Sequence, residues 1–311
     1  MRNAFASQLF NLAGQNKKIV LLSADIGNRL FNEYKSKYPD RFFNCGVAES
    51  NMTGMAAGMA MNGLIPVTYT ITPFNTYRCL EHIRVDICYH QLHVIIVGVG
   101  SGLAYANLGA THQSCEDIAI MSALPHMTVV CPGDPLEVRF ALEAALNYKK
   151  PVYIRLGKKN EPSVHKELSH FQIGKAIPLH FVDQCFYDVC IISTGTTLPL
   201  AVESAKILNR KHISSEVVSS HTVKPLDTEF LASIANAVKL IVTIEEHSSI
   251  GGLGSLIAQW LIENDYQKTK VLQCATPDSF LQYTGGHQHA RQQVGLTENV
   301  VVQKILNKLA N

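Results

Sequence analysis

The 311-residue sequence is short of several features that would place a protein in a familiar class. None of its eight cysteines forms a C-x-x-C pair, which argues against a zinc site or a redox motif. No apolar run approaches the ~20 residues that a membrane span needs. The N-terminal segment also lacks the apolar core and cleavage site of a signal peptide. We therefore expect a globular cytoplasmic protein with free thiols.

Charge is sparse and balanced. Only 17% of residues are charged, and 27 Lys and Arg against 25 Asp and Glu leave a net charge of +2 without a dense basic run. This balance gives no reason to expect nucleic acid or a membrane surface as partner. Hydrophobic residues make up 47%, which is enough to fill ordinary cores, and the length suggests two domains.

Short runs rich in Val and Ile alternate with helical patterns from end to end, as in parallel sheets covered on both faces. Strands are expected at 18–25, 64–70, 93–100, 127–132, 151–157, 188–195, 214–220, 238–246 and 270–275, and helices at 3–15, 48–62, 74–89, 134–148, 198–210, 227–236, 252–264 and 297–310. Asp134 has the sequence context of a helix N-cap. We predict an α/β fold of two domains, 1–160 and 187–311, each a mostly parallel sheet flanked by helices, with a linker at 161–186.

One acid stands out in the stretch FNCGVAESNMTGMAAGMAMNG, residues 43–63. Glu49 opens a predicted helix that carries no charge from Ser50 to Gly63. An acid in a first turn is favoured by the helix dipole, which could be a sufficient explanation. However, a carboxylate entering a packed, uncharged helix is costly unless a partner compensates it.

Further polar or aromatic residues follow other predicted strands. Asp25 ends the first strand, Phe74 and Tyr77 bracket the start of a helix, and His112 follows a strand and loop in NLGATHQSCEDIA. Each has an ordinary structural explanation alone. Together they would meet at the carboxyl edge of a parallel sheet, where α/β proteins bind ligands.

The order of these blocks carries a family resemblance. SADIGN, RFFNCGVAESNMTGMAAGMA, PFNTYR and GATHQSCEDIAIMSALPHMTVVCPGDPLE resemble the pyrimidine-binding domain of thiamine-diphosphate-dependent transketolases. The segments DVCIISTGTTLPLAVESAKIL and VTIEEHSSIGGLGS are similar, more loosely, to the C-terminal domain of that family. The resemblance covers nearly the whole chain and implies a transferase that moves a two-carbon ketol unit from a ketose or ketose phosphate to an aldehyde.

The resemblance implies roles in cofactor binding. Glu49 would hydrogen-bond a nitrogen of the cofactor's aminopyrimidine ring and so activate the thiazolium carbon, which requires a carboxyl shielded from water. Phe74 would stack on the aminopyrimidine, and Tyr77 would line the same pocket. Asp25 would lie near the thiazolium ring.

The resemblance also implies roles in substrate binding. His112 would hydrogen-bond an oxygen of the donor and help to move protons. Asp25 and Asn28 would lie near the substrate. Arg2, and more weakly Arg155, would bind a sugar phosphate through the planar fork of the guanidinium.

Full-length members of the family hold the diphosphate through Mg²⁺ with a G-D-G stretch, and this sequence has none. Its one G-D, Gly133-Asp134, precedes a proline and caps a helix. We therefore expect thiamine diphosphate and Mg²⁺ to be shared with a second subunit that supplies the metal ligands, in an assembly of two plus two chains. No metal ligand is predicted in this chain: the H-x-H of 287–289 has no further ligand at a known spacing.

Several positions depart from the family pattern. Leu108 stands where the family usually has an aspartate that contacts a substrate hydroxyl, Gly100 replaces a histidine, and Ile71 replaces an aromatic residue. The substrates are therefore expected to be unusual. Three alternatives stay open: a deoxyxylulose-phosphate-synthase-like enzyme that uses pyruvate, the beta subunit of a 2-oxoacid dehydrogenase, and a non-catalytic partner subunit.

Overall fold

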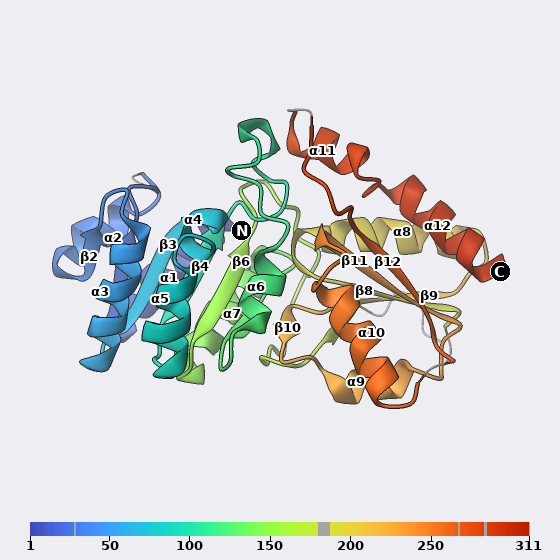
Figure 1. The fold of residues 1–311 in the computed structure, drawn as a ribbon, viewed down its shortest axis with the longest axis horizontal. Helices are drawn as coiled ribbons and strands as arrows, with labels where there is room; N and C mark the ends of the chain where they lie inside the picture. The colour runs from blue at the N-terminus through green and yellow to red at the C-terminus, as the bar shows by residue number, and fades with distance from the viewer. Residues whose placement is uncertain (28, 180–186, 267, 283–284, 311) are drawn as a thin grey trace.

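The computed structural model describes residues 1–27, 29–179, 187–266, 268–282 and 285–310. They form two sheets side by side, each covered by helices (Figure 1). The first sheet has the order β10-β5-β6-β4-β3-β1-β2 and is parallel except for β10. Its strands are β1 (Ile19–Ser23), β2 (Phe42–Asn44), β3 (Ile65–Ile71), β4 (Ile95–Val99), β5 (Thr128–Val130), β6 (Val152–Leu156) and β10 (Thr222–Lys224).

The second sheet has the order β12-β11-β8-β9-β7 and is parallel except for β7. Its strands are β7 (Ile177–Pro178), β8 (Val189–Ser193), β9 (Ser215–Ser219), β11 (Leu240–Ser248) and β12 (Lys270–Thr276). The central strands are buried along their whole length. This explains why they read as continuous apolar runs without alternation.

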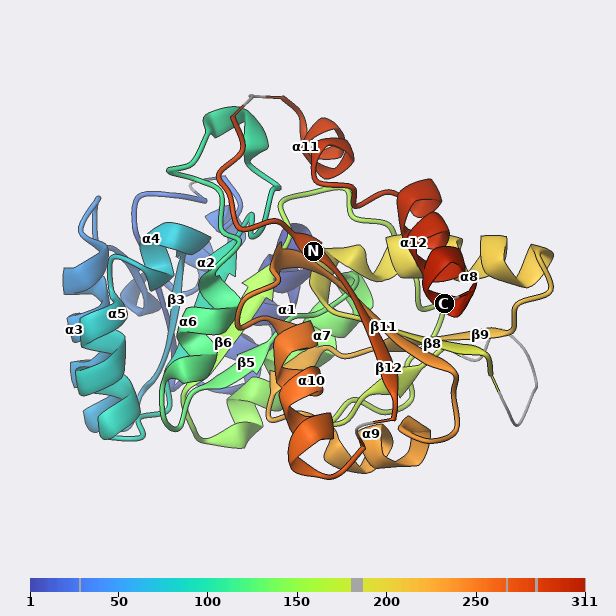
Figure 2. The same cartoon turned by 45° about the vertical axis from the view of Figure 1, so that its right-hand side comes forward.

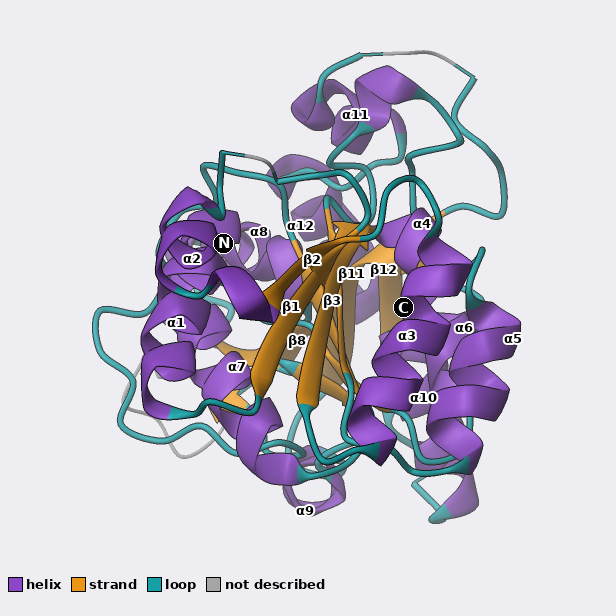
Figure 3. Cartoon of the chain, turned by 90° about the vertical axis from the view of Figure 1, so that its left-hand side faces the viewer, coloured by secondary structure: helices purple, strands orange, loops and turns teal. Residues whose placement is uncertain are grey.

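Helices sandwich the first sheet. On one face, α1 (Arg2–Gln15), α2 (Asn32–Lys37) and α7 (Pro135–Tyr148) bury Phe5, Leu9, Val138 and Leu142 in one core (Figure 3). On the other face lie α3 (Glu49–Met61), α5 (Leu80–His82) and α6 (Asp117–Ala123). The predicted capping of α7 is confirmed, since Asp134 Oδ1 accepts from the backbone N–H groups of Leu136 and Glu137 at 2.9 and 2.8 Å.

The second sheet is covered in the same way. Helices α8 (Leu198–Arg210) and α12 (Glu298–Ala310) bury one face. Helices α9 (Thr228–Ile234) and α10 (Leu253–Glu263) cover the other, and their apolar residues belong to one core with those of α3 and α6. This continuous core fixes the two domains against each other. None of the helices in the described residues is long and apolar enough to cross a membrane.

The predicted fold class and the predicted strands are confirmed, and the structure adds β2, α2 and α6, which were not predicted. The structure differs from the predictions in three further ways. The single helix expected at 74–89 is divided into α4 (Thr72–Thr76), α5 and a π-helical segment, η2 (Ile83–Tyr89). The predicted linker contributes β7 to the edge of the second sheet. Strand β10 leaves the C-terminal half to pair antiparallel with β5 of the first sheet. The remaining short elements are η1 (Pro39–Arg41), η3 (Ala106–Leu108), η4 (Gly195–Thr197) and α11 (His287–Gln293).

Candidate active site

Three neighbouring parallel strands deliver the predicted site residues to one edge of the first sheet. Asp25 follows β1, Phe74 follows β3, and His112 lies on the loop that follows β4. Because β4, β3 and β1 are adjacent and parallel, their carboxyl ends lie together. Glu49 reaches this edge from the first turn of α3, which packs against β3.

Glu49 is buried, and its carboxylate has a partner that sequence analysis missed. Only 5% of Glu49 is exposed. Arg78 Nη1 donates to its two carboxylate oxygens at 3.1 and 3.3 Å. The Arg78 guanidinium also lies over the ring of Phe74, 4.0 Å from its centroid. Glu49 and Phe74 therefore hold one flat, hydrogen-bonding group between them.

The residues around Glu49 fit the aminopyrimidine ring of thiamine diphosphate. That ring is also flat and polar, and it needs an aromatic surface for stacking and a shielded acid for its ring nitrogen. The side chain of Arg78 is 50% exposed, so it can swing into solvent and leave this space to a ligand. The arrangement of Glu49 and Phe74 thus has the chemistry that the cofactor requires.

His112 stands beside the same aromatic ring. Its imidazole centroid is 5.0 Å from that of Phe74 and 6.1 Å from that of Tyr105, both in edge-on orientations. Burial and the nearby charge of Arg78 lower the pKa of His112 below its usual value of 6.5. A neutral imidazole at neutral pH can accept a proton as well as donate one, which suits a residue that contacts a reacting oxygen.

Tyr77 and Asp25 have their contacts outside the group formed by Glu49, Phe74 and His112. Tyr77 lines a cavity of about 360 Å³ between the domains, together with Leu103 and Cys115. Its hydroxyl donates to Glu116 at 2.8 Å. Asp25 is exposed at a positive φ of 48°, and Asn44 Nδ2 donates to its carboxylate at 3.1 Å. Asn44 belongs to β2, so Asp25 is held on the side of β1 that faces away from β3 and Phe74.

The two predicted phosphate ligands differ. Arg155 is 3% exposed, and its guanidinium donates to the Asp117 carboxylate and to the carbonyl oxygens of Ser114 and Glu246. A phosphate cannot reach it, so we replace its predicted role with a structural one. Arg2 is half-buried at the start of α1, and its Nε atom has no hydrogen-bond partner within the described part of the chain.

Lys158 is a further cation that the sequence did not single out. It lies in a polar stretch between the last predicted strand of the first domain and the predicted linker. Its Nζ atom is 4.2 Å from the ring centroid of Tyr105, the residue that also contacts His112. Burial and the positive charges of Lys159 and Arg2 lower the pKa of Lys158. The charges of Lys158, Lys159 and Arg2 thus act on one another, and an anionic group bound beside Lys158 would relieve their repulsion.

The two remaining predictions concern substrate selection. Leu108 ends the η3 turn with 47% of the residue exposed, and its side chain offers no hydrogen-bond acceptor there. Asn28 lies outside the described residues.

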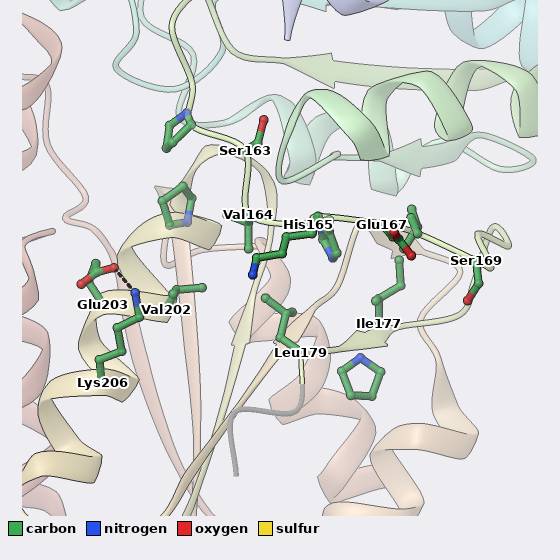
Figure 4. Close-up of a pocket in the computed structure, with 15 residues that line it drawn as sticks. Ser163, Val164, His165, Glu167, Ser169, Ile177, Leu179, Val202, Glu203 and Lys206 are labelled. Atoms are coloured by element: carbon green, nitrogen blue, oxygen red, sulfur yellow. Dashed lines mark hydrogen bonds and ion pairs between the residues drawn. The ribbon is translucent and has the colours of Figure 1, made fainter. Parts of the chain in front are cut away.

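A separate cavity of about 680 Å³ lies between the 162–169 segment and α8 (Figure 4). It is lined by Val164, Leu179 and Val202, with an ion pair between Glu203 and Lys206 at its edge. None of the predicted site residues lines it.

Comparison with known families defines the class of protein. The pyrimidine binding domain of transketolase matches residues 1–163, and the transketolase C-terminal domain matches residues 182–301. The chain therefore belongs to the transketolase family, whose enzymes are thiamine-diphosphate-dependent transferases.

Individual relatives narrow the assignment. The chain is 35% identical to a putative transketolase C-terminal section from Methanocaldococcus jannaschii, over 99% of this chain and 96% of that protein. It is 36% identical to one of the subunits of an apulose-4-phosphate transketolase from Phocaeicola vulgatus, over 85% of this chain and 84% of that protein. A solved split gene transketolase, described as an inactive beta4 tetramer, superposes with a TM-score of 0.88 at 35% identity and covers 99% of this chain and 97% of its own. The chain is a subunit of a split transketolase, which confirms the predicted family and activity.

Proposed function

We propose that this subunit supplies the pyrimidine half of a thiamine diphosphate site, and that a second subunit supplies the diphosphate half with Mg²⁺. The observation that carries the proposal is the flat guanidinium held between Glu49 and Phe74. The sequence has no G-D-G stretch for a diphosphate-bound metal. A relative described as a split gene transketolase supports the division between two chains.

The surface around Glu49 suits a partner chain. Helix α3 carries no charge beyond Glu49, and two apolar residues stand exposed at its ends, Val47 at 75% and Met61 at 56%. A partner that covers this face would also complete the shielding of the Glu49 carboxyl from water. We propose two copies of each subunit, with a site at each junction. A cytoplasmic location stays a prediction from the sequence.

The chemistry assigns a task to each side chain. Thiamine diphosphate, when bound, supplies the carbon nucleophile and the electron sink for cleavage beside a ketose carbonyl. Glu49 holds a proton at the pyrimidine nitrogen, and Phe74 fixes the plane of the ring. His112 hydrogen-bonds an oxygen of the donor and exchanges a proton with it as the carbon–carbon bond breaks or forms. Tyr77 and Asp25 border the site.

The cationic groups point to an anionic substrate. Lys158 contacts the ring of Tyr105, and the charge of Arg2 acts on the same tyrosine, so the two cations can neutralise a phosphate or a similar anion at the far end of a sugar. Leu108 cannot accept a hydrogen bond from a substrate hydroxyl, which favours an acceptor that lacks the usual 2-hydroxyl group or carries it differently. A relative named for apulose-4-phosphate supports a phosphorylated sugar of uncommon structure as the substrate.

The test uses this subunit assembled with its diphosphate-binding partner. We expect transfer of a two-carbon unit from a phosphorylated ketose to an aldehyde, and little turnover of pyruvate. The Glu49→Gln variant should lose ~10²–10⁴ of this activity, the usual contribution of a positioned acid–base group, while the assembly still binds the cofactor. Glu81→Gln, an exposed acid on α5, is the matched control and should keep full activity. Turnover of pyruvate instead of ketoses would favour the synthase-like alternative, and full activity of Glu49→Gln would contradict the assignment of Glu49.

A further inference from the structure

The loop that carries His112 is held from outside its own domain. Residues 101–114 leave the end of β4 and close on themselves, since Gly102 and Ser114 exchange backbone hydrogen bonds of 2.9 Å in both directions. A series of tight turns joins these ends, among them bonds from Ala106 N to Leu103 O and from His112 N to Gly109 O. The position of His112 therefore depends on how the base of the loop is fixed.

Glu246 of the C-terminal domain fixes one side of that base. It lies on β11, is 1% exposed, and its Oε1 atom accepts from Leu103 N at 2.6 Å. The same carboxylate accepts from His287 Nε2 at 2.9 Å and from Arg291 Nε, both on α11. Three donors from two segments thus converge on one buried carboxylate, which compensates its loss of hydration.

The loop backbone packs closely against the Glu246 carboxylate. A Cβ atom at Gly102 would lie 2.5 Å from Glu246 Oε1, so only glycine permits this close approach, and the φ of +63° at Gly102 also favours glycine. The main chain of Glu246 takes part as well, because its carbonyl accepts from Arg155 Nη2 at 3.0 Å. Arg155 Nη2 also donates to Ser114 O at 3.1 Å. Both ends of the loop are therefore tied to the same residue of β11.

An apolar contact supports the same junction. Leu103 and Ala106 of the loop pack with Ala290 of α11 in a small cluster separate from the main cores. Figures 1 and 2 show the loop and α11 side by side at the top of the molecule. The ion pairs and this cluster together bring α11 onto the loop.

We propose that Glu246 is a positioning residue for His112: it holds the 102–114 loop in the geometry that places the imidazole beside Phe74. This inference rests on the proposed role of His112 in ketol transfer. It assigns to the C-terminal domain a part in the reaction, although Glu49, Phe74 and His112 all belong to the first domain. A loop released by loss of the Glu246 charge would let His112 shift, and a misplacement of about 1 Å can cost ~10²-fold in rate.

The neighbouring residue provides a matched control. Glu245 is also fully buried on β11, and its carboxylate also accepts from two backbone N–H groups, those of Leu253 and Gly254 at 2.7 and 2.8 Å. These belong to the first turn of α10, away from the His112 loop. Glu245→Gln should therefore lower the stability of the protein and leave the loop in place. Glu246→Gln should lower the stability and also release the loop.

The experiment measures hydrogen–deuterium exchange and kinetics on the assembled enzyme. For Glu246→Gln we expect faster amide exchange across 102–114 and a kcat lower by about tenfold to a hundredfold, with the affinity for thiamine diphosphate unchanged. In a His112→Ala background the same change should have little further effect on kcat, because the group that it positions is gone. Glu245→Gln should leave loop exchange and kcat at the wild-type level.

Each contrary result has its own meaning. Unchanged exchange in the loop would overturn the proposal whatever the kinetics show. Faster exchange with unchanged kcat, or with a full additional loss in the His112→Ala background, would show that the loop is held but that His112 is not positioned through it. If Glu246→Gln failed to fold, His287→Ala would replace it, since His287 is partly exposed and its loss leaves Arg291 in place. If the wild-type assembly transferred no ketol unit, the proposed function would fail, while the exchange data would still decide whether Glu246 holds the loop.

Discussion

Glu49 and Glu246 are both buried acids near the candidate active site, yet their surroundings differ in kind. The Glu49 carboxylate is paired with Arg78, whose side chain is half exposed. The Glu246 carboxylate is bound by a backbone N–H group, a histidine and an arginine, all at the junction of the two domains. An acid whose partner can move away can bind a ligand in its place. An acid enclosed by the protein's own hydrogen-bond donors has a structural role.

The two adjacent acids of β11 differ in pKa, although both accept hydrogen bonds from the protein itself. Burial opposes ionisation of Glu246, but the charges of Arg291 and His287 outweigh it and hold the pKa of Glu246 well below its usual range. Burial raises the pKa of the adjacent Glu245, because backbone N–H groups and His247 compensate its charge less fully. Burial alone therefore does not decide the state of an acid, and the partners do.

If Glu49 differs from Glu246 because its partner can leave, removal of Arg78 should change the affinity for the cofactor. If Arg78 occupies the space of the aminopyrimidine ring, Arg78→Ala should tighten binding of thiamine diphosphate to the assembled enzyme. A half-exposed ion pair contributes up to about 1 kcal/mol, so the dissociation constant should fall by up to about fivefold. Arg84→Ala, which removes an exposed arginine from η2, is the control for the loss of charge. Weaker binding in Arg78→Ala alone would mean that Arg78 contacts the cofactor instead of competing with it.

A smaller effect concerns Glu137, a further buried acid, which lies on α7. Burial raises the pKa of Glu137 from 4.5 to about 7. Its neighbour His165 has a raised pKa too, since burial is outweighed by the hydrogen bond to Asp134 and the charge of Glu137. Both groups bind protons more tightly in the folded state, so the part of the free energy of unfolding that they contribute should fall as pH rises, from about 4.5 through 7 for Glu137 and above 6.5 for His165.

Thermal unfolding between pH 5 and 8 checks this sign. The Tm of the wild-type chain minus that of Glu137→Gln should fall by a few degrees across that range, because buried histidines with a lowered pKa, such as His221, act in both proteins. For Glu143→Gln, an exposed acid on the same helix, the Tm difference from the wild type should not change with pH. A difference between the wild type and Glu137→Gln that rises with pH would contradict the raised pKa of Glu137.

Local chemistry made much of the fold predictable. The Val- and Ile-rich runs became β1, β3, β4, β6, β8 and β11 because strands buried on both faces carry few polar residues. The cap at Asp134 followed from its own context. Strand β10 was missed, since only its pairing with β5, about 90 positions earlier, makes three residues a strand. The break in the helix at 74–89 was missed as well, because no proline or glycine marks it.

The candidate site was predictable in part for the same reason. Asp25, Phe74 and His112 each follow a predicted strand of the first sheet, and parallel strands bring their carboxyl ends together. Glu49 stood out as the one acid at the start of an uncharged helix. Arg78 and Glu246 carry no local signal: Arg78 meets an acid 29 positions away, and Glu246 meets Leu103 across 143 positions. Arg155 was misjudged because a strand-end arginine has the same sequence appearance whether it meets a phosphate or a buried aspartate.

The division of the cofactor site between two chains can be measured by calorimetric titration of thiamine diphosphate with Mg²⁺, first on this chain alone and then on its assembly with the diphosphate-binding subunit. We expect the assembly to bind the cofactor and this chain alone not to bind it, because Glu49 and Phe74 contact only the pyrimidine half. Tight binding by this chain alone would contradict a divided site, since it would require a site for the diphosphate and its metal within these 311 residues.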